Sequence, residues 1–145
     1  MMLTTKGRYA VMAMVDIALN SHGNAVSLQD ISTRQHITLN YLEQIFLKLK
    51  KAGLVSSLRG PGGGYKLNAG AEGIKVVDII GAVDEEIKIT RCNGNERSGC
   101  MHDKTRCLTH DLWEGLGNHI AHYLGSVSLA DICNRHIPRN EAYGS

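Results

Sequence analysis

Long hydrophobic runs are missing from this chain of 145 residues. The longest uninterrupted apolar run, Ala10 to Val15, is far shorter than the roughly 20 residues that a membrane helix needs. Arg8 and Asp16 interrupt the first apolar stretch, so it does not resemble a secretory signal peptide. The chain also lacks the low hydrophobicity and high net charge of disordered proteins, because 43% of its residues are hydrophobic and its formal net charge is only +2. We therefore expect a globular, soluble protein of the cytoplasm with no membrane partner.

Catalytic patterns are lacking as well. No Ser-His-Asp, paired-carboxylate or Cys-His arrangement typical of an enzyme stands out. The glycine-rich run over 60–65 lacks the Lys-Ser/Thr pair that completes a phosphate-binding loop, and no predicted helix starts after it. A tight turn of the backbone explains these glycines better. The sequence therefore does not predict an enzyme.

The charges that are present divide unevenly along the chain. Residues 1–70 hold eight Lys or Arg and three acids, a net charge of +5. Residues 71–145 hold eight basic residues and eleven acids, a net charge of −3. A basic half followed by an acidic half fits a polyanion-binding module joined to a second unit, although a lopsided surface explains the imbalance equally well.

The first 70 residues show three helical patterns and then two short strand patterns. Ser27 and Thr38 stand where N-caps are expected, and Gly53 stands where a left-handed glycine ends a helix. A tight turn between the second and third helices, with a hairpin after them, is the winged variant of the helix-turn-helix. The expected elements are helices over 5–20, 28–35 and 38–52 and strands over 54–58 and 64–67.

The remaining residues predict a loop and a long helix. A short helix is expected over 74–83, a loop over 84–105, a long helix from about Thr105, and a last helix over 128–134. The long helix carries an apolar stripe with a period of four: Leu108, Leu112, Leu116, Ile120 and Leu124. Such a stripe packs on a partner helix, and a second copy in a homodimer is favoured over the chain's own domain. The predicted fold is mainly α with a small β-hairpin, in which a winged helix-turn-helix over 1–70 precedes a dimerisation helix region over 71–145.

A winged helix-turn-helix places its third helix in the major groove of double-stranded DNA. Gln is suited to adenine there, and Glu accepts from the cytosine amino group. An Arg at the wing tip inserts into the minor groove or contacts a phosphate. Each side chain alone is equally compatible with a solvated surface, whereas together on one face they favour an operator contact. The candidates are Thr38, Asn40, Tyr41, Glu43 and Gln44 on the third helix, Arg59 and Gly60 on the wing, and Lys6 and Arg8 on the first helix.

Three cysteines and a histidine form a candidate metal site. Cys92, Cys100 and Cys107 fall within sixteen residues, and His110 follows Cys107 at a spacing that places both on one face of a helical turn. Structural zinc sites favour fewer residues between paired cysteines, so the spacing here favours an iron–sulfur cluster. The alternative without a metal is that these are free thiols and a surface histidine. His102 is a competing ligand. The fourth cysteine, Cys133, is interpreted as a small buried hydrophobe.

Several stretches resemble the IscR family of iron–sulfur cluster regulators, which are winged-helix transcription factors. They are residues 2–11 (MLTTKGRYAV), 41–44 (YLEQ), 53–65 (GLVSSLRGPGGGY) and 107–110 (CLTH), and the similarity extends to about residue 133. The resemblance implies a dimer with a 2Fe-2S cluster on Cys92, Cys100, Cys107 and His110. It also implies that Glu43 helps to discriminate operator classes, that Gln44 and Arg59 read bases, and that the targets are cluster-assembly genes.

Three functions remain as alternatives. An enzyme or electron carrier would show no salt-dependent DNA binding. The other two are related regulators. A nitric-oxide-responsive iron–sulfur repressor would share the wing, and a zinc-stabilised winged-helix protein would bind DNA without a cluster. For the cluster sensor, we expect binding to order residues 88–107 and to fix the start of the long helix, which would bias the two recognition helices relative to each other, with repression or activation as the outcome.

Overall fold

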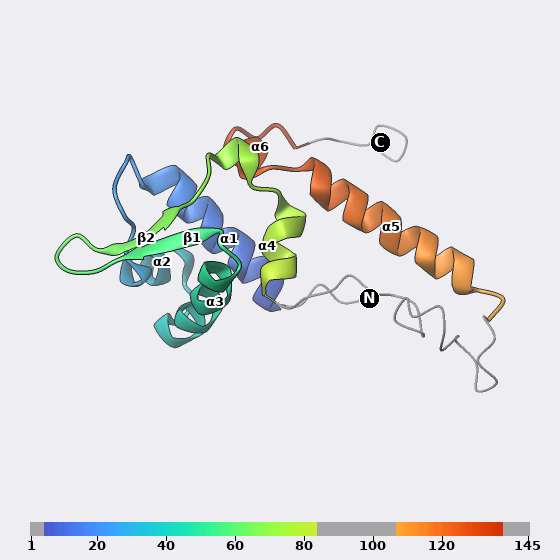
Figure 1. Ribbon diagram of the computed structural model, residues 1–145, viewed down its shortest axis with the longest axis horizontal. Coiled ribbons are helices and arrows are strands. Elements are labelled where there is room, and N and C mark those ends of the chain that lie inside the picture. The colour runs from blue at the N-terminus through green and yellow to red at the C-terminus, as the bar shows by residue number, and fades with distance from the viewer. Residues whose placement is uncertain (1–4, 84–106, 138–145) are drawn as a thin grey trace.

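The structure is mainly helical with one small hairpin, as the sequence predicts (Figure 1). It is a computed structural model, and it describes residues 5–83 and 107–137. A long helix projects away from the body formed by the other elements (Figure 1). In chain order, the described elements are α1 (Thr5–Asn20), α2 (Leu28–Gln35), α3 (Leu39–Lys51), β1 (Val55–Leu58), β2 (Gly64–Leu67), the 3-10 turn η1 (Ala71–Gly73), α4 (Val76–Ala82), α5 (His110–Ser126) and α6 (Leu129–Cys133).

Side-chain caps fix the helix-turn-helix. The Ser27 hydroxyl accepts a hydrogen bond from the Asp30 N–H at 3.1 Å, and the Thr38 hydroxyl accepts one from the Tyr41 N–H at 3.3 Å. These bonds satisfy N–H groups that the first turns of α2 and α3 leave without a helical partner. Gly53 follows α3 with a φ of 81°, a left-handed conformation that costs glycine little. The predicted caps and the predicted left-handed glycine are all confirmed.

The wing is an antiparallel hairpin that is also attached to the body. Its first residue pair is Val55 with Leu67. Beside it, Val26 exchanges two backbone hydrogen bonds with Tyr65, at 2.9 and 2.8 Å. A Cβ on Gly64 would overlap the backbone of Val26. The hairpin therefore depends on a glycine at this point to lie close against the segment that precedes α2.

The larger of two hydrophobic clusters joins the helix-turn-helix, the wing, α4 and α6, and α1 runs through its centre. It contains residues from the helix-turn-helix together with residues of α4, of α6 and of the segments beside them. The fully buried side chains of α1 pack against partners far away in the sequence. Members of the cluster include Ala10, Ala13, Met14, Ile17, Ile31, Leu42, Phe46, Leu49, Ile74, Ile79, Val83 and Leu129. The division of the chain at residue 70 stays a prediction, and this core extends across that position.

The long helix begins later than the sequence predicts. Its first residue is His110, whereas the prediction placed the start near Thr105, which lies outside the described residues. The His110 N–H donates to the Cys107 carbonyl at 3.1 Å, a tight turn, and the first hydrogen bond of α-helical spacing runs from Trp113 to Thr109. Leu108 therefore lies in this turn and is fully exposed, so its assignment to the helical stripe is wrong.

The segment after α5 returns to the body and pairs with the segment before α4. The Val76 N–H donates to the Val127 carbonyl and the Leu129 N–H donates to the Ile74 carbonyl, both at 2.9 Å. Ser128 then caps α6, as predicted, and forms a reciprocal capping box with Asp131. The end of α5 is therefore fixed to the start of α4 by backbone hydrogen bonds.

Among the described helices, none has both the length and the hydropathy of a membrane span.

Candidate nucleic-acid interface and metal centre

The outer face of α3 carries three of the nine predicted DNA contacts. Asn40, Glu43 and Gln44 are all exposed, and their spacings of three and four residues place them on one side of the helix. Tyr41 is half-buried, because its ring packs edge-to-face against Tyr9 with a centroid distance of 5.7 Å. The opposite side of α3 faces the core through Leu42, Ile45, Phe46 and Leu49. The helix therefore presents a polar stripe outward from a firmly packed support.

The wing tip carries Arg59 and Gly60, both exposed. The Gly60 carbonyl accepts a hydrogen bond from the Gly63 N–H at 2.8 Å, which closes the turn. On the first strand of the wing, the Ser57 hydroxyl accepts a hydrogen bond from the Lys50 ammonium at 2.8 Å. This bond links the end of α3 to β1, so it fixes the wing relative to the third helix.

Two further basic candidates lie in the first turn of α1. Lys6 is half-buried and Arg8 is exposed. Thr38, the remaining candidate, is exposed, and its hydroxyl accepts the cap hydrogen bond of α3. Thr38 therefore has a structural role whether or not it meets a ligand.

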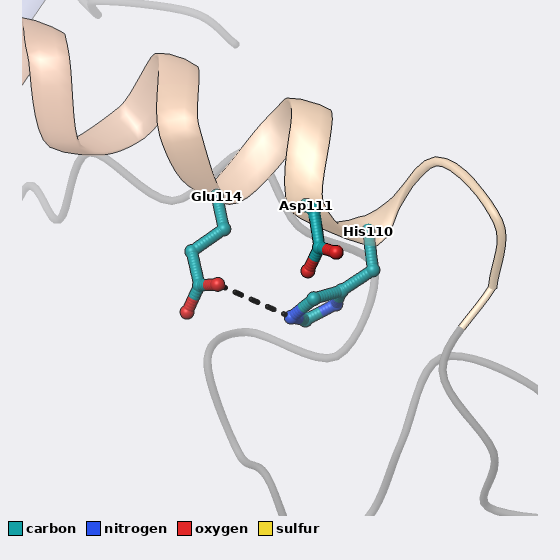
Figure 2. A group of neighbouring side chains, drawn as sticks. All are labelled: His110, Asp111 and Glu114. Atoms are coloured by element: carbon teal, nitrogen blue, oxygen red, sulfur yellow. Dashed lines mark ion pairs between the residues drawn. The ribbon is translucent and has the colours of Figure 1, made fainter.

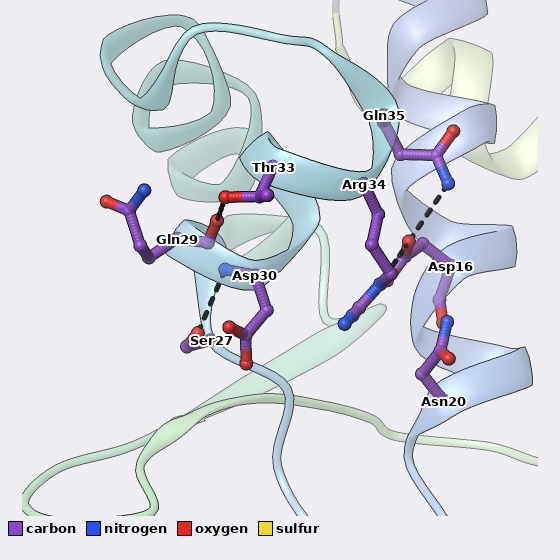
Figure 3. Close-up of polar contacts among 8 residues, drawn as sticks. All are labelled: Asp16, Asn20, Ser27, Gln29, Asp30, Thr33, Arg34 and Gln35. Atoms are coloured by element: carbon purple, nitrogen blue, oxygen red, sulfur yellow. Dashed lines mark hydrogen bonds and ion pairs between the residues drawn. The ribbon is translucent and has the colours of Figure 1, made fainter.

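A buried carboxylate links α1 to the end of α2 (Figure 3). Asp16 is 1% exposed, and its two oxygens accept hydrogen bonds from Arg34 at 3.0 and 2.7 Å. Gln35 donates a third hydrogen bond at 2.9 Å. Burial raises the pKa of Asp16, but the hydrogen bonds from Arg34 and Gln35 and the charge of Arg34 outweigh it, so the pKa lies below its usual value.

The sequence pattern alone did not predict this ion pair. Asp16 is the one acid within the apolar pattern of α1, and a lone carboxylate in a buried helix needs a cationic partner. That requirement could have identified Asp16 as half of a pair. Nothing local identifies Arg34, because it lies eighteen residues further along the chain.

Two of the four predicted metal ligands lie within the described residues. Cys107 is half-exposed in the turn before α5, with its sulfur 3.6 Å from the Thr109 hydroxyl. His110 is 3% exposed and is the first residue of α5. The predicted placement of both on one helical turn is wrong for Cys107, which precedes the helix. The turn nevertheless places the two residues together through the His110 to Cys107 backbone hydrogen bond.

Acidic side chains stand beside His110 (Figure 2). Its Nε2 atom lies 3.8 Å from a Glu114 carboxylate oxygen, which is longer than a hydrogen bond. Asp111 completes a group whose potential ligand atoms all lie within 4.8 Å of one another. Cys92, Cys100 and His102 lie outside the described residues. Cys133 is half-buried on α6 rather than fully buried, and burial raises the pKa of its thiol.

The apolar stripe of α5 is open along much of its length. Leu112 is 61% exposed and Leu116 is 43% exposed. A groove along the second half of the helix is lined by Leu116, Ile120 and Tyr123, among others. Leu124 differs, because it packs against a small buried cluster of Val76, Ile80 and Val127. Among the described residues of α5, His110 alone is fully buried.

Comparison with known proteins gives consistent results. The Rrf2 family model, described as iron-dependent transcriptional regulator, matches residues 3–135. The HTH-type transcriptional regulator IscR of Xenorhabdus nematophila is 55% identical over 132 residues, which cover 91% of this chain and 79% of that protein. The corresponding protein of Vibrio atlanticus is 54% identical, with coverages of 91% and 75%.

A solved structure, IscR of T. potens, superposes with a TM-score of 0.76 at 34% identity and covers 100% of this chain and 93% of its own. The resemblance inferred from the sequence motifs is confirmed by these matches. So is the fold class, because the helices and the two-stranded hairpin match a solved IscR structure. The relatives are DNA-binding transcriptional regulators, and enzymes do not figure among these matches. This chain therefore belongs to the Rrf2 family of iron-dependent transcriptional regulators, and it is a DNA-binding transcriptional regulator with a winged-helix fold.

Proposed function

We propose that this regulator senses iron–sulfur cluster status through a 2Fe-2S cluster and controls the genes for cluster assembly. The observation that carries the proposal is the position of Cys107 and His110, side by side at the start of a helix whose other end is bonded to the DNA-binding body. Because a regulator of this kind acts on DNA, we also propose that it works in the cytoplasm.

We assign the contacts with DNA to the outer face of α3, the tip of the wing and the first turn of α1. Asn40, Glu43 and Gln44 would meet base edges in the major groove, with Gln44 suited to adenine and Glu43 to cytosine. Arg59 and the Gly60 backbone at the wing tip would contact the minor groove or a phosphate. Thr38, Tyr41, Lys6 and Arg8 complete the proposed interface by holding the backbone of the operator.

The donor set suits the proposed cofactor. Thiolates and an imidazole are ligand types of iron–sulfur clusters, and a histidine in place of a cysteine raises the reduction potential. Cys107 and His110 supply one donor of each type from a single turn. Cys92 and Cys100 would supply the other two thiolates. When bound, the cluster would supply a redox-sensitive and oxygen-sensitive group, and the four side chains would hold it.

The same turn gives a route from the cofactor to the operator. Cys107 and His110 fix the start of α5, and the hydrogen bonds at Val127 and Leu129 fix its end to the start of α4. The α4 helix packs on α1, which supports α3 through the common core. Ordering of residues 88–107 would therefore bias the position of the recognition helix through packed elements.

We further propose that α5 forms the interface of a homodimer. Leu112, Leu116 and Ile120 would pack against the same residues of a second copy, because an isologous contact uses one surface twice. The exposure of Leu112 and Leu116 supports this assignment, since large leucines in a continuous stripe are normally covered. Leu124 would sit at the edge of the contact, and Leu108 would lie outside the helix.

Purification without oxygen tests the cofactor. We expect a coloured protein with about two irons and two acid-labile sulfides per chain. Cys107→Ser and His110→Ala should lose the colour and the sulfide, with helical content unchanged by circular dichroism. Cys133→Ser is the matched control, because this half-buried cysteine lies on α6 and is not a proposed ligand, and it should retain both.

Metal analysis, nitric-oxide exposure and DNA-binding assays separate the alternative functions. A colourless protein that contains zinc would contradict the cluster and favour the zinc-stabilised regulator. Bleaching by nitric oxide together with the loss of all DNA binding would favour the nitric-oxide-responsive repressor. If Cys107→Ser lost the cluster but kept the wild-type affinity for every operator, the proposed coupling between the cluster and the operator would be wrong.

A further inference from the structure

The outward stripe of α3 contains one large apolar side chain, Leu47. It lies three residues after Gln44 and four after Glu43, so it is their neighbour on the same side of the helix. The Leu47 side chain is 67% exposed, more than any other large hydrophobic residue of α3. Lys51, one turn further on, is also exposed. The stripe thus runs from Asn40 to Lys51 with a leucine among polar and charged residues.

Packing within the described part of the chain does not account for Leu47. It belongs to neither of the two hydrophobic clusters, whereas Leu42, Phe46 and Leu49 of the same helix are fully buried in the larger one. A single exposed leucine is common on protein surfaces and by itself indicates nothing. Its place on this particular stripe is what distinguishes it, because a helix that turns Gln44 toward the bases turns Leu47 the same way.

The major groove offers an apolar side chain one specific partner. Each thymine projects a C5-methyl group into the groove, and the other base-edge groups there are hydrogen-bond donors and acceptors. Leucine has no donor or acceptor, so it gains from covering a methyl group and loses where it covers an unpaired polar base edge. Leu47 therefore has the chemistry to favour thymine and to disfavour cytosine at one position.

We propose that Leu47 is a specificity-determining residue that contacts a thymine methyl group in the operator. The proposal rests on the assignment of α3 to the major groove. It adds apolar readout of thymine to the hydrogen-bonding readout assigned to Glu43 and Gln44. Lys51 at the end of the stripe would contact a phosphate nearby and would set the depth at which Leu47 enters the groove.

Deoxyuridine substitution tests this contact, because it removes only the methyl group. The protein, purified without oxygen, is first used to select binding duplexes from a random pool. Each thymine of the selected duplex is then replaced by deoxyuridine in turn. For the wild type we expect about fourfold weaker binding at one thymine per half-site, the change that corresponds to one methyl group. For Leu47→Ala we expect no penalty at that position.

Two control variants separate the possible failures. Leu19→Ala removes a comparably exposed leucine, 52% exposed, from the last turn of α1 and should leave the deoxyuridine penalty intact. Gln44→Ala should change the selected sequence whether or not Leu47 reads a methyl group. If Gln44→Ala changes the selection while wild type and Leu47→Ala show identical deoxyuridine penalties, the Leu47 proposal is overturned and the α3 assignment stands. If neither Gln44→Ala nor Leu47→Ala alters the selected sequence or the deoxyuridine penalties, the assignment of α3 to the groove fails, and the Leu47 proposal fails with it.

Discussion

Removal of Arg34 should destabilise the protein through the carboxylate that it leaves behind. Asp16 is 1% exposed, and Arg34 provides two of the three hydrogen bonds that its carboxylate accepts from side chains in Figure 3. In Arg34→Ala the carboxylate keeps Gln35 but loses its counter-charge. The carboxylate itself is buried whereas the Arg34 side chain reaches solvent, so water would replace the guanidinium only in part. The change therefore tests a buried charge rather than a surface ion pair.

The loss in free energy of unfolding that we expect for Arg34→Ala lies between two limits. Breaking a fully buried pair costs about 3–5 kcal/mol, whereas exposed pairs contribute at most about 1 kcal/mol. The Arg34 side chain is 39% exposed, so solvent already screens its end of the interaction. We expect Arg34→Ala to lower the free energy of unfolding by about 2–3 kcal/mol. For a chain of this size, that corresponds to a melting temperature lower by about 5–10 °C.

Urea denaturation of four proteins measures the pair itself. Wild type, Asp16→Asn, Arg34→Ala and the double variant form a double-mutant cycle, from which the coupling energy follows. We expect a coupling of about 1.5 kcal/mol or more at pH 7. Arg8→Ala, which removes an exposed arginine from α1, is the matched control and should change stability by less than about 0.5 kcal/mol. A coupling near zero would refute the reasoning.

The pH dependence has a definite sign. In the wild type the pKa of Asp16 is lowered, so its contribution to stability is present above the unfolded value near pH 4 and is lost as the pH falls through the folded value. In Arg34→Ala, burial would dominate and raise the pKa of Asp16. Protonation of the carboxylate would then relieve the cost of burying its charge as the pH falls. The stability difference between the two proteins should therefore be largest at neutral pH and shrink below about pH 5.

The remaining predictions concern the wing and the dimer. Gly64→Ala should lower the free energy of unfolding by roughly 2 kcal/mol, because the new Cβ would overlap the Val26 backbone; in the same urea assay Gly73→Ala, whose Cβ would meet only ordinary contacts, should be near neutral. Leu116→Glu should convert a dimer to a monomer in sedimentation velocity, whereas Asn118→Glu, at an exposed position of α5 away from the stripe, should not. A monomeric wild type would contradict the proposed interface.

Local chemistry made much of the fold predictable. Ser27, Thr38 and Gly53 mark helix ends through bonds and conformations that depend on residues within one turn. The change from helical to alternating apolar spacing after Gly53 then located the wing. These features involve neighbours in the sequence, which is why one sequence was sufficient to place α1, α2, α3 and the hairpin.

The start of α5 was not predictable in the same way. The apolar spacing of four continues back to Leu108, yet the backbone bond from His110 to Cys107 makes a tighter turn there. Side-chain periodicity reports which positions are apolar, and it does not report which carbonyl an N–H will use. The pairing of Asp16 with Arg34, and of 74–76 with 127–129, involves residues far apart in the chain. Spacing carries no information about such partners.

The proposed coupling between the cluster and the operator would depend on some of those distant contacts. The proposed metal ligands all follow α4 in the sequence, and the last of them, His110, is the first residue of α5. The proposed DNA contacts all precede residue 61. Within the described part of the chain, the end of α5 meets the body through Val127 and Leu129, which bond to Val76 and Ile74 on either side of Lys75. An influence from residues 107–110 that travels along α5 therefore enters the core at this point, beside α4 and α1. The α3 helix shares that core, so a shift of α4 would change the support on which the outward stripe of α3 rests.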